Sequence, residues 1–110
     1  MKVAIPVAQG NLCLHFGHCE EFAVFETDGN RVTGEERHTP PNHAPGVLPE
    51  WLKKLGVDVV IAGGMGMRAQ QFFNRYGIEV LVGAEATAPR QAVEKYLQGT
   101  LQTGENICDH

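Results

Sequence analysis

The stretch VDVVIAGGMG, residues 57–66, joins a nearly unbroken apolar run to a cluster of glycines. Residues 57–62 have the composition of a central parallel strand that is buried on both faces. Three glycines in the next four positions, followed by an apolar pattern of helical spacing, predict a tight turn from this strand into a helix. A strand that passes directly into a helix is the repeating unit of α/β proteins, so this stretch sets the expected fold class.

Three segments of the chain carry apolar residues at the spacing of one helix face. They end at Gly56, Gly77 and Gly99, and a glycine commonly stops a helix. Thr87 is predicted to cap the start of the third helix, which extends to Gln98. The predicted buried stripes are Leu48, Trp51, Leu52 and Leu55 in the first helix, Ala69, Phe72, Phe73 and Tyr76 in the second, and Ala92, Val93, Tyr96 and Leu97 in the third.

Four further segments are predicted as strands, namely residues 2–7, 21–27, 31–38 and 78–82, whereas residues 8–20 are predicted as a loop. Residues 28–30, Asp-Gly-Asn, have the composition of a hairpin turn. In the strand that precedes this turn, Phe22 and Val24 are predicted to face one side of the sheet, and Ala23 and Phe25 the other. A hairpin followed by alternating strands and helices predicts an α/β fold with a mixed sheet and helices on its faces.

Length and composition exclude several classes of protein. A chain of 110 residues with 43% hydrophobic residues fits one globular domain, residues 1–110, with a flexible tail expected over about residues 100–110. The net charge of −4 and the absence of any run of Lys or Arg argue against nucleic-acid binding. The apolar run at residues 3–7 is too short for a membrane span or a signal peptide. Three cysteines without a disulfide spacing indicate a cytoplasmic protein with reduced thiols.

The loop sequence NLCLHFGHCE, residues 11–20, holds two cysteines and two histidines within seven residues. Thiolate and imidazole suit iron, copper or zinc, so these side chains are candidate metal ligands. The spacing C-x-H-x-x-H-C differs from that of closed zinc sites, which argues against a structural zinc ion. For Cys13 and Cys19, packing as small buried side chains is an equal alternative. His15 is the favoured functional residue, and His18 is a further candidate.

Residues 63–66, Gly-Gly-Met-Gly, form a second candidate site at the end of a buried strand and the start of a helix. Such a turn offers backbone N–H groups and the positive end of the helix dipole to an anion. Arg68 adds a positive charge there. The pattern G-x-G-x-x-A with Glu85 about twenty residues later also fits a dinucleotide fingerprint, although weakly. A plain tight turn is the structural alternative, and for Met65 and Met67 core packing is favoured over contact with a metal.

The sequence ends with Cys108-Asp109-His110. Terminal residues are usually mobile, so the default expectation is that they have no role. The alternative is a Cys-x-His arm that folds over a metal cluster bound elsewhere, which makes Cys108 and His110 candidate ligands. His43 lies in a proline-rich loop, residues 39–49, of a length that is often functional.

His15-Phe16-Gly17 with the following strand, and residues 57–66 followed by Arg68-Ala69, resemble the dinitrogenase iron–molybdenum cofactor biosynthesis family. The likeness extends from Lys2 to the third helix. It implies a ribonuclease H-like, three-layer α/β fold with a five-stranded mixed sheet and three helices. It also implies a protein that binds a metal–sulfur cluster, of the iron–sulfur or iron–molybdenum type, as a carrier or store and not as an enzyme.

Within this resemblance, His15 and the turn Gly63, Gly64, Met65 and Gly66, with Arg68, correspond to the cluster site. Cys13, His18 and Cys19 depart from the commonest pattern of small family members, and His43 lies where the family varies. The implied partners are proteins that donate or accept the cluster, with neither nucleic acid nor a membrane. The chain is expected to be a monomer or a weak homo-oligomer.

The sequence also bears on three other functions. A ribonuclease H-like nuclease needs carboxylates in its sheet to hold two metal ions, and residues 2–7 contain none. A small module that binds a nucleotide or phosphate anion at residues 63–66 is the stronger alternative, although the chain lacks a second mononucleotide-binding half. A thiol-dependent redox enzyme ranks last, because no C-x-x-C is present.

Overall fold

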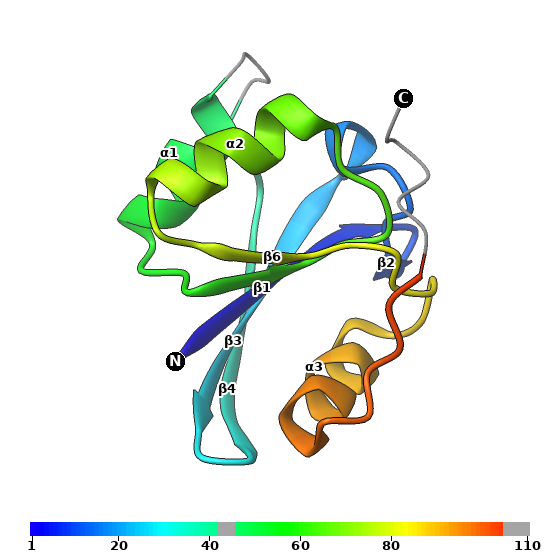
Figure 1. The fold of residues 1–110 in the computed structure, drawn as a ribbon. Helices are drawn as coiled ribbons and strands as arrows, with labels where there is room; N and C mark the ends of the chain where they lie inside the picture. The colour runs from blue at the N-terminus through cyan, green and yellow to red at the C-terminus, as the bar shows by residue number, and fades with distance from the viewer. Residues whose placement is uncertain (42–45, 105–110) are drawn as a thin grey trace.

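The computed structural model describes residues 1–41 and 46–104. Its strands form one mixed sheet in which five strands have the order β4-β3-β1-β5-β6 (Figure 1). A short sixth strand, β2, pairs with β1 outside this order. The pairs β1–β3 and β3–β4 are antiparallel, whereas β1–β5 and β5–β6 are parallel. The strands are β1 (Lys2–Ala8), β2 (Asn11–Leu12), β3 (Glu21–Asp28), β4 (Arg31–His38), β5 (Val59–Ile61) and β6 (Glu79–Leu81).

Helices cover both faces of this sheet. Helices α1 (Val47–Lys54) and α2 (Met67–Arg75) lie on one face, and α3 (Pro89–Gln98) lies on the other (Figure 1). A single 3-10 turn, η1 (Phe16–His18), precedes β3. The α/β class, the mixed sheet and the three helices are thus confirmed. The ribonuclease H-like assignment stays a prediction.

Two apolar cores lie on the two faces of the sheet. Phe22 and Val24 contribute to the core under α1 and α2, and Ala23 and Phe25 to the core under α3. The predicted alternation along β3 is therefore confirmed. The predicted helix stripes also face these cores, except that Phe72 is only half-buried and borders a surface pocket.

The structure corrects the prediction in three places. The sheet has a sixth strand, because residues 11 and 12 pair with β1 inside the segment predicted as a loop. The central strand β5 is shorter than predicted. Finally, Thr87 is not the cap of α3, which begins at Pro89 after Ala88 without a side-chain cap. The ring of Pro89 sets a helical φ at the first turn, and the Thr87 carbonyl instead accepts a hydrogen bond from Leu12 N–H at 2.8 Å.

The chain that follows α3 is held against the sheet. Leu101, inside the segment predicted as a tail, packs on the core under α3. The Gly104 N–H donates a hydrogen bond to the Gly83 carbonyl at 2.9 Å. Across residues 1–41 and 46–104, no helix combines the length and apolar character that crossing a bilayer requires.

Candidate functional site

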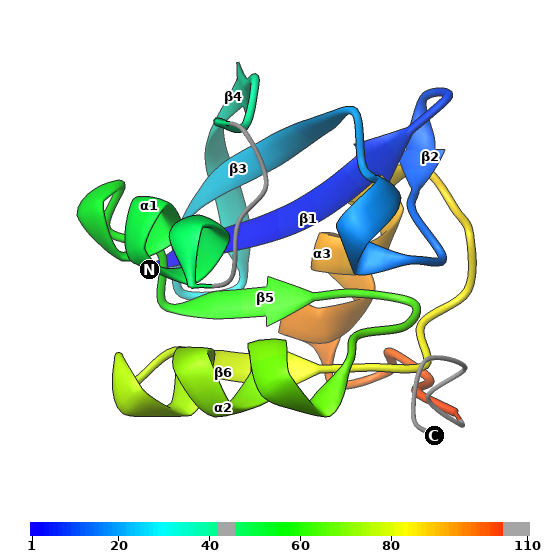
Figure 2. The ribbon, with the colours of Figure 1, turned by 90° about the horizontal axis from the view of Figure 1, so that it is seen from above.

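The two sequence motifs, fifty residues apart, lie side by side in the structure. The N–H of Phe16 donates a hydrogen bond to the carbonyl of Gly64 at 2.9 Å. In Figure 2 the blue turn η1 lies next to the green segment that leads from β5 to α2. The structure therefore joins the histidine-containing loop and the glycine turn into one region of the surface.

Gly63 lets these two segments approach each other. A Cβ atom added to Gly63 would lie 2.8 Å from the Cα of Leu14 and 3.1 Å from the carbonyl oxygen of Cys13. Such distances are too short for a side chain, and the atoms in the way belong to backbone. Close packing of the loop thus accounts for Gly63 without a ligand.

The rest of the glycine turn changes from buried to exposed along the chain. Gly64 is buried and the Met65 side chain is fully enclosed in the core under α1 and α2, which confirms the packing alternative for Met65. Gly66 is exposed, and a Cβ added there would meet no atom within 4 Å. Met67 is 60% exposed, so the expectation of core packing is wrong for this residue, which begins α2 on its outer side.

The exposed end of the turn is the N-terminus of α2. Gly66 is the cap residue, with no side-chain hydrogen bond to the helix, and the first turn contains no acidic residue. Arg68, in that first turn, is exposed and forms no ion pair within the described part of the chain. Backbone N–H groups, the helix dipole and a guanidinium thus favour an anion at this place.

The turn η1, whose backbone bonds to Gly64, carries two exposed histidines. His15 and His18 are both exposed, and their ring centroids lie 5.7 Å apart. The turn is closed by a hydrogen bond from His18 N–H to the His15 carbonyl at 2.9 Å. Phe16 anchors it from below, since its buried ring lies with its centroid 5.7 Å from those of Phe22 and Phe73. A buried aromatic anchor therefore holds both histidines at the surface.

The two cysteines of the loop point into the protein core, unlike the two exposed histidines. Cys13 and Cys19 are 6% and 8% exposed and belong to the core under α1 and α2. The Cys13 thiol donates a hydrogen bond to the His15 carbonyl at 3.0 Å. Burial, reinforced by the nearby Cys13, raises the pKa of Cys19 to about 11, so its thiol is protonated at neutral pH. These observations favour the packing alternative for both cysteines.

The four candidate ligands of the loop do not converge. Among residues 1–41 and 46–104, no group of three or more His, Cys, Asp or Glu side chains is placed to hold a metal ion. Three other candidates, His43, Cys108 and His110, lie outside the described residues.

An apolar pocket of about 220 Å³ adjoins the site. Phe16 from η1 and Arg68 from α2 are part of its wall, so it lies against both halves of the site. The other lining residues are Gly46, Leu48, Pro49, Ala69 and Phe72. Sequence reasoning missed this pocket, and it also missed Leu14, which is 44% exposed between Cys13 and His15. An apolar residue inside a glycine-containing loop was the available signal for Leu14.

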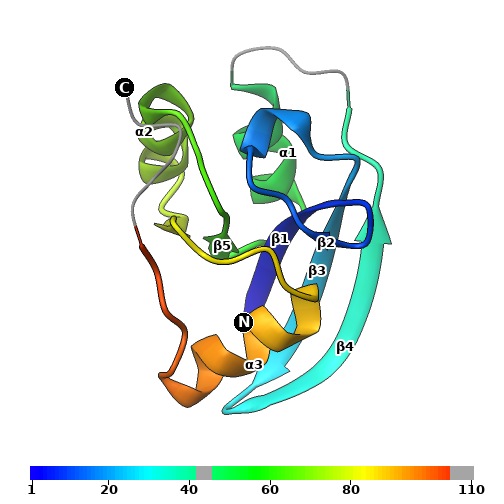
Figure 3. The same cartoon turned by 90° about the vertical axis from the view of Figure 1, so that its right-hand side faces the viewer.

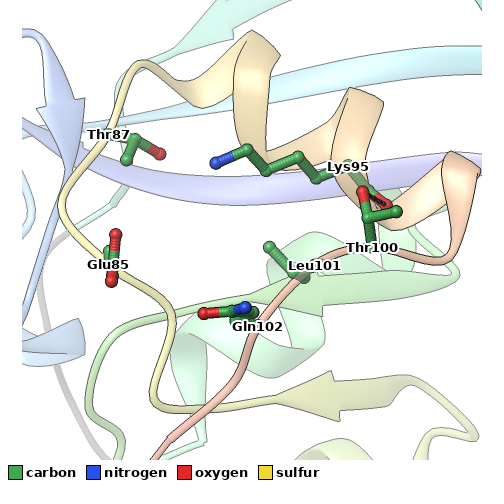
Figure 4. Close-up of a pocket in the computed structure, with 6 residues that line it drawn as sticks. All are labelled: Glu85, Thr87, Lys95, Thr100, Leu101 and Gln102. Carbon is green, nitrogen blue, oxygen red and sulfur yellow. Dashed lines mark hydrogen bonds between the residues drawn. The ribbon is translucent and has the colours of Figure 1, made fainter.

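Glu85 lies in a separate pocket of about 260 Å³ on the α3 side of the sheet (Figure 4). In this view Glu85 and Thr87 line one side, opposite Lys95 and Leu101. The dinucleotide fingerprint would place this carboxylate beside the glycine turn, but the pocket shares no lining residue with residues 63–68. The position of Glu85 thus weighs against the dinucleotide hypothesis.

Comparison with known proteins gives consistent results. A family model described as "Dinitrogenase iron-molybdenum cofactor" matches residues 1–99. The uncharacterised protein MJ0580 of Methanocaldococcus jannaschii is 29% identical over 110 residues, which cover 96% of this chain and 92% of that protein.

Two solved structures are similar over nearly their whole length. The crystal structure of PH0822 has a TM-score of 0.87 and 30% identity, and the match covers 94% of both chains. The apo form of the orange protein from Desulfovibrio gigas has a TM-score of 0.77 and 24% identity, with 96% of this chain and 93% of that one covered. The second likeness shows a shared fold.

Proposed function

Because this chain belongs to the dinitrogenase iron–molybdenum cofactor family, whose model spans residues 1–99, we propose that it binds a metal–sulfur cluster reversibly. The protein carries or stores the cluster and does not transform it. The observation that supports this function best is the docking of η1 on the glycine turn, because the backbone of the turn that carries exposed His15 and His18 bonds to Gly64, two residues before the cap of α2.

The chemistry of this surface suits a cluster as cargo. A metal–sulfur cluster is large, soft and usually anionic, so it is stabilised by N–H groups, helix dipoles and positive side chains. Gly66 and Arg68 supply these features at the start of α2. Imidazole is a suitable ligand for iron or copper. Few strong ligands are an advantage for a carrier, because each additional one would slow release of the cluster.

The burial of the loop cysteines also fits a carrier. A thiol that is protonated and enclosed in a core is a poor metal ligand. Cys13 and Cys19 are both buried, and the raised pKa of Cys19 keeps its thiol protonated, so the exposed side chains that the loop offers to a cargo are imidazoles and not thiolates. Contacts of this kind suit temporary binding.

The cellular setting follows from this function. The proposed partners are proteins that donate the cluster to this chain or accept it, in a cytoplasm that keeps thiols and sulfide reduced. Neither nucleic acid nor a membrane is needed. A monomer or weak homo-oligomer suffices, because all the residues of the proposed site come from one chain.

A module that binds a phosphate or nucleotide anion is the alternative use of the same helix end. The N-terminus of α2 and Arg68 favour it. The position of Glu85 in a different pocket weighs against a dinucleotide. Equilibrium dialysis with ATP and with inorganic phosphate, alongside cluster uptake, separates the two functions.

The central experiment is anaerobic reconstitution with ferrous iron and sulfide, followed by the visible absorption spectrum and the metal-to-sulfide ratio. We expect a coloured complex in the parent protein. His15→Ala should take up less cluster while its circular dichroism is unchanged, because His15 is exposed. His38→Ala is the matched control, since His38 pairs with Glu36 on strand β4, away from the site. Equal uptake by His15→Ala and the parent would remove His15 from the site.

A further inference from the structure

The pocket of about 260 Å³ on the α3 side of the sheet is formed by three segments of the chain. Its lining residues are Glu85 and Thr87 from the chain between β6 and α3, Lys95 from α3, and Thr100, Leu101 and Gln102 from the chain after α3. Figure 3 shows the orange-to-red chain after α3 running back toward the yellow chain that follows β6. None of the lining residues belongs to η1, the glycine turn or α2, so the pocket is separate from the proposed cluster site.

Hydrogen bonds to the Lys95 carbonyl fix one side of this pocket. The N–H groups of Thr100 and Leu101 donate to this oxygen at 2.9 and 3.2 Å, and the Thr100 hydroxyl donates to it at 3.4 Å. The side chain of Leu101 also packs on the core under α3. The chain after α3 is therefore held where it borders the pocket.

The chain between β6 and α3 is held at both of its ends. Gly83 N–H donates to the Gly63 carbonyl at 2.6 Å, and the Gly83 carbonyl accepts a hydrogen bond from Gly104 N–H at 2.9 Å. At the other end, the Thr87 carbonyl accepts a hydrogen bond from Leu12 N–H at 2.8 Å. The pocket is thus bordered by fixed backbone and exists before a ligand binds, which lowers the entropy that binding costs.

The charged side chains of the pocket are left without a partner in the protein. Within the part of the chain that the structure describes, the Lys95 ammonium and the Glu85 carboxylate form no ion pair and no hydrogen bond, and both side chains are exposed. Figure 4 shows the Lys95 amino group pointing across the pocket toward Thr87, on the side from which Glu85 also projects. The pocket therefore offers one positive and one negative group.

This combination of charges favours a ligand that carries both signs. An anion attracted by Lys95 is repelled by Glu85, and for a cation the reverse holds. The Thr87 hydroxyl and the Gln102 amide add neutral donors and acceptors. The volume of about 260 Å³ lies below the range of roughly 300–1,000 Å³ that is usual for pockets with drug-sized ligands, so the ligand must be small.

We propose that this pocket binds a small zwitterion, namely a free α-amino acid with a short side chain. Its carboxylate pairs with the Lys95 ammonium, and its ammonium pairs with the Glu85 carboxylate. This site is additional to the proposed function and does not depend on it, because the two sites share no residue.

The first test compares L-alanine with its two halves. Glycine, L-serine, L-alanine, propionate, ethylamine and glycerol are each titrated into the protein, and amide chemical shifts are followed. We expect saturable shifts with the three amino acids, largest at residues 85–87 and 100–102. Propionate and ethylamine should bind at least about 10-fold more weakly than L-alanine, because each leaves one charged group of the pocket without a partner.

Three results of this titration would overturn the proposal. The first is the absence of a saturable shift with all three amino acids. The second is an affinity for propionate or ethylamine equal to that for L-alanine. The third is preferred binding of glycerol, which would identify a site for neutral polyols.

The second test removes one charge of the pocket at a time. Lys95→Met and Glu85→Gln should each weaken L-alanine binding by at least about 10-fold. Lys53→Met is the matched control, since Lys53 is an exposed lysine in the last turn of α1, on the other face of the sheet, and should bind L-alanine like the parent. Urea unfolding of the variants shows that they are folded. Parent affinity in both Lys95→Met and Glu85→Gln would contradict the zwitterion site.

Discussion

At the scale of single residues, Gly63 shows that a glycine in a suspected binding turn can serve packing. Its missing side chain is matched by the backbone of Leu14, whereas Gly66, three positions later, faces open space. The sequence GGMG does not distinguish these two positions. Their difference arises from a loop fifty residues away, which no local pattern can reveal.

We expect Gly63→Ala to lower the free energy of unfolding by about 1–3 kcal/mol, because the new methyl group must displace the backbone of Leu14. Urea unfolding followed by the fluorescence of Trp51 measures this change. Gly17→Ala is the matched control in the same region, since a Cβ there meets no atom within 4 Å. Equal stability of the two variants would contradict the close approach at Gly63.

A second residue-scale prediction concerns Cys19. Its pKa is raised to about 11 by burial and by Cys13, against an ordinary value of 9.0 in the unfolded chain. The folded state therefore favours the protonated thiol, and its contribution to stability is fully present below pH 9 and is lost as the pH rises through 11. We expect a loss of stability of at most about 3 kcal/mol.

The measurement compares unfolding free energies at pH 8 and pH 10.5 in the parent and in Cys19→Ala. The parent should lose more stability than the variant between these two values, because other groups titrate equally in both. A difference of zero would place Cys19 in contact with solvent and remove the basis for its packing role.

At the scale of secondary-structure elements, the first turn of α2 has a charge that disfavours the helix but favours the binding of an anion. An arginine in the first turn of a helix is unfavourable to the helix dipole, and no acidic residue offsets Arg68 there. The placement is reasonable if an anion binds. We therefore expect Arg68→Glu to raise stability by about 0.3–1 kcal/mol and to reduce cluster uptake.

Arg75→Glu is the matched control for this exchange. Arg75 lies in the last turn of α2, where a positive charge is favourable to the dipole, so this variant should lose stability and keep cluster uptake. Chemical unfolding and reconstitution of both variants give the answer. If both variants lose uptake equally, net charge and not the helix end governs binding.

Helices and strands were predicted correctly where a periodic pattern of apolar residues marks the face that the element buries. The stripes of α1 and α3 and the alternation along β3 face the cores as expected. Strand β2 was missed because two residues are too few for any periodic signal. The cap of α3 was misplaced because Thr87 has the right chemistry, while its carbonyl pairs with Leu12 and Pro89 starts the helix.

At the scale of the whole molecule, binding should stabilise the fold, because the proposed site joins segments that are distant in sequence. A ligand that binds only the folded state adds about 2.7 kcal/mol to the unfolding free energy at 100 times its Kd. We expect the loaded parent to unfold at higher urea than the apo protein. A smaller increase is expected for His15→Ala, and no increase in the parent would contradict a site built across the fold.

The sequence predicted the α/β class and the mixed sheet from local patterns, and the family resemblance brought the two motifs together. Local patterns alone could not do so, because the contact between Phe16 and Gly64 depends on how β1 pairs with β5. The inward direction of Cys13 and Cys19 was equally out of reach. It is set by the anchoring of Phe16, which turns the imidazoles outward and leaves the thiols in the core.

The hydrogen bond from Phe16 to Gly64 has a consequence for how the protein is made. When a ribosome has translated the first sixty residues, His15 and His18 are present in the chain, whereas the glycine turn at residues 63–66 is not. A nascent or partly folded chain thus has only one half of the proposed binding site. Completion of the native sheet is therefore a condition for the proposed site to exist.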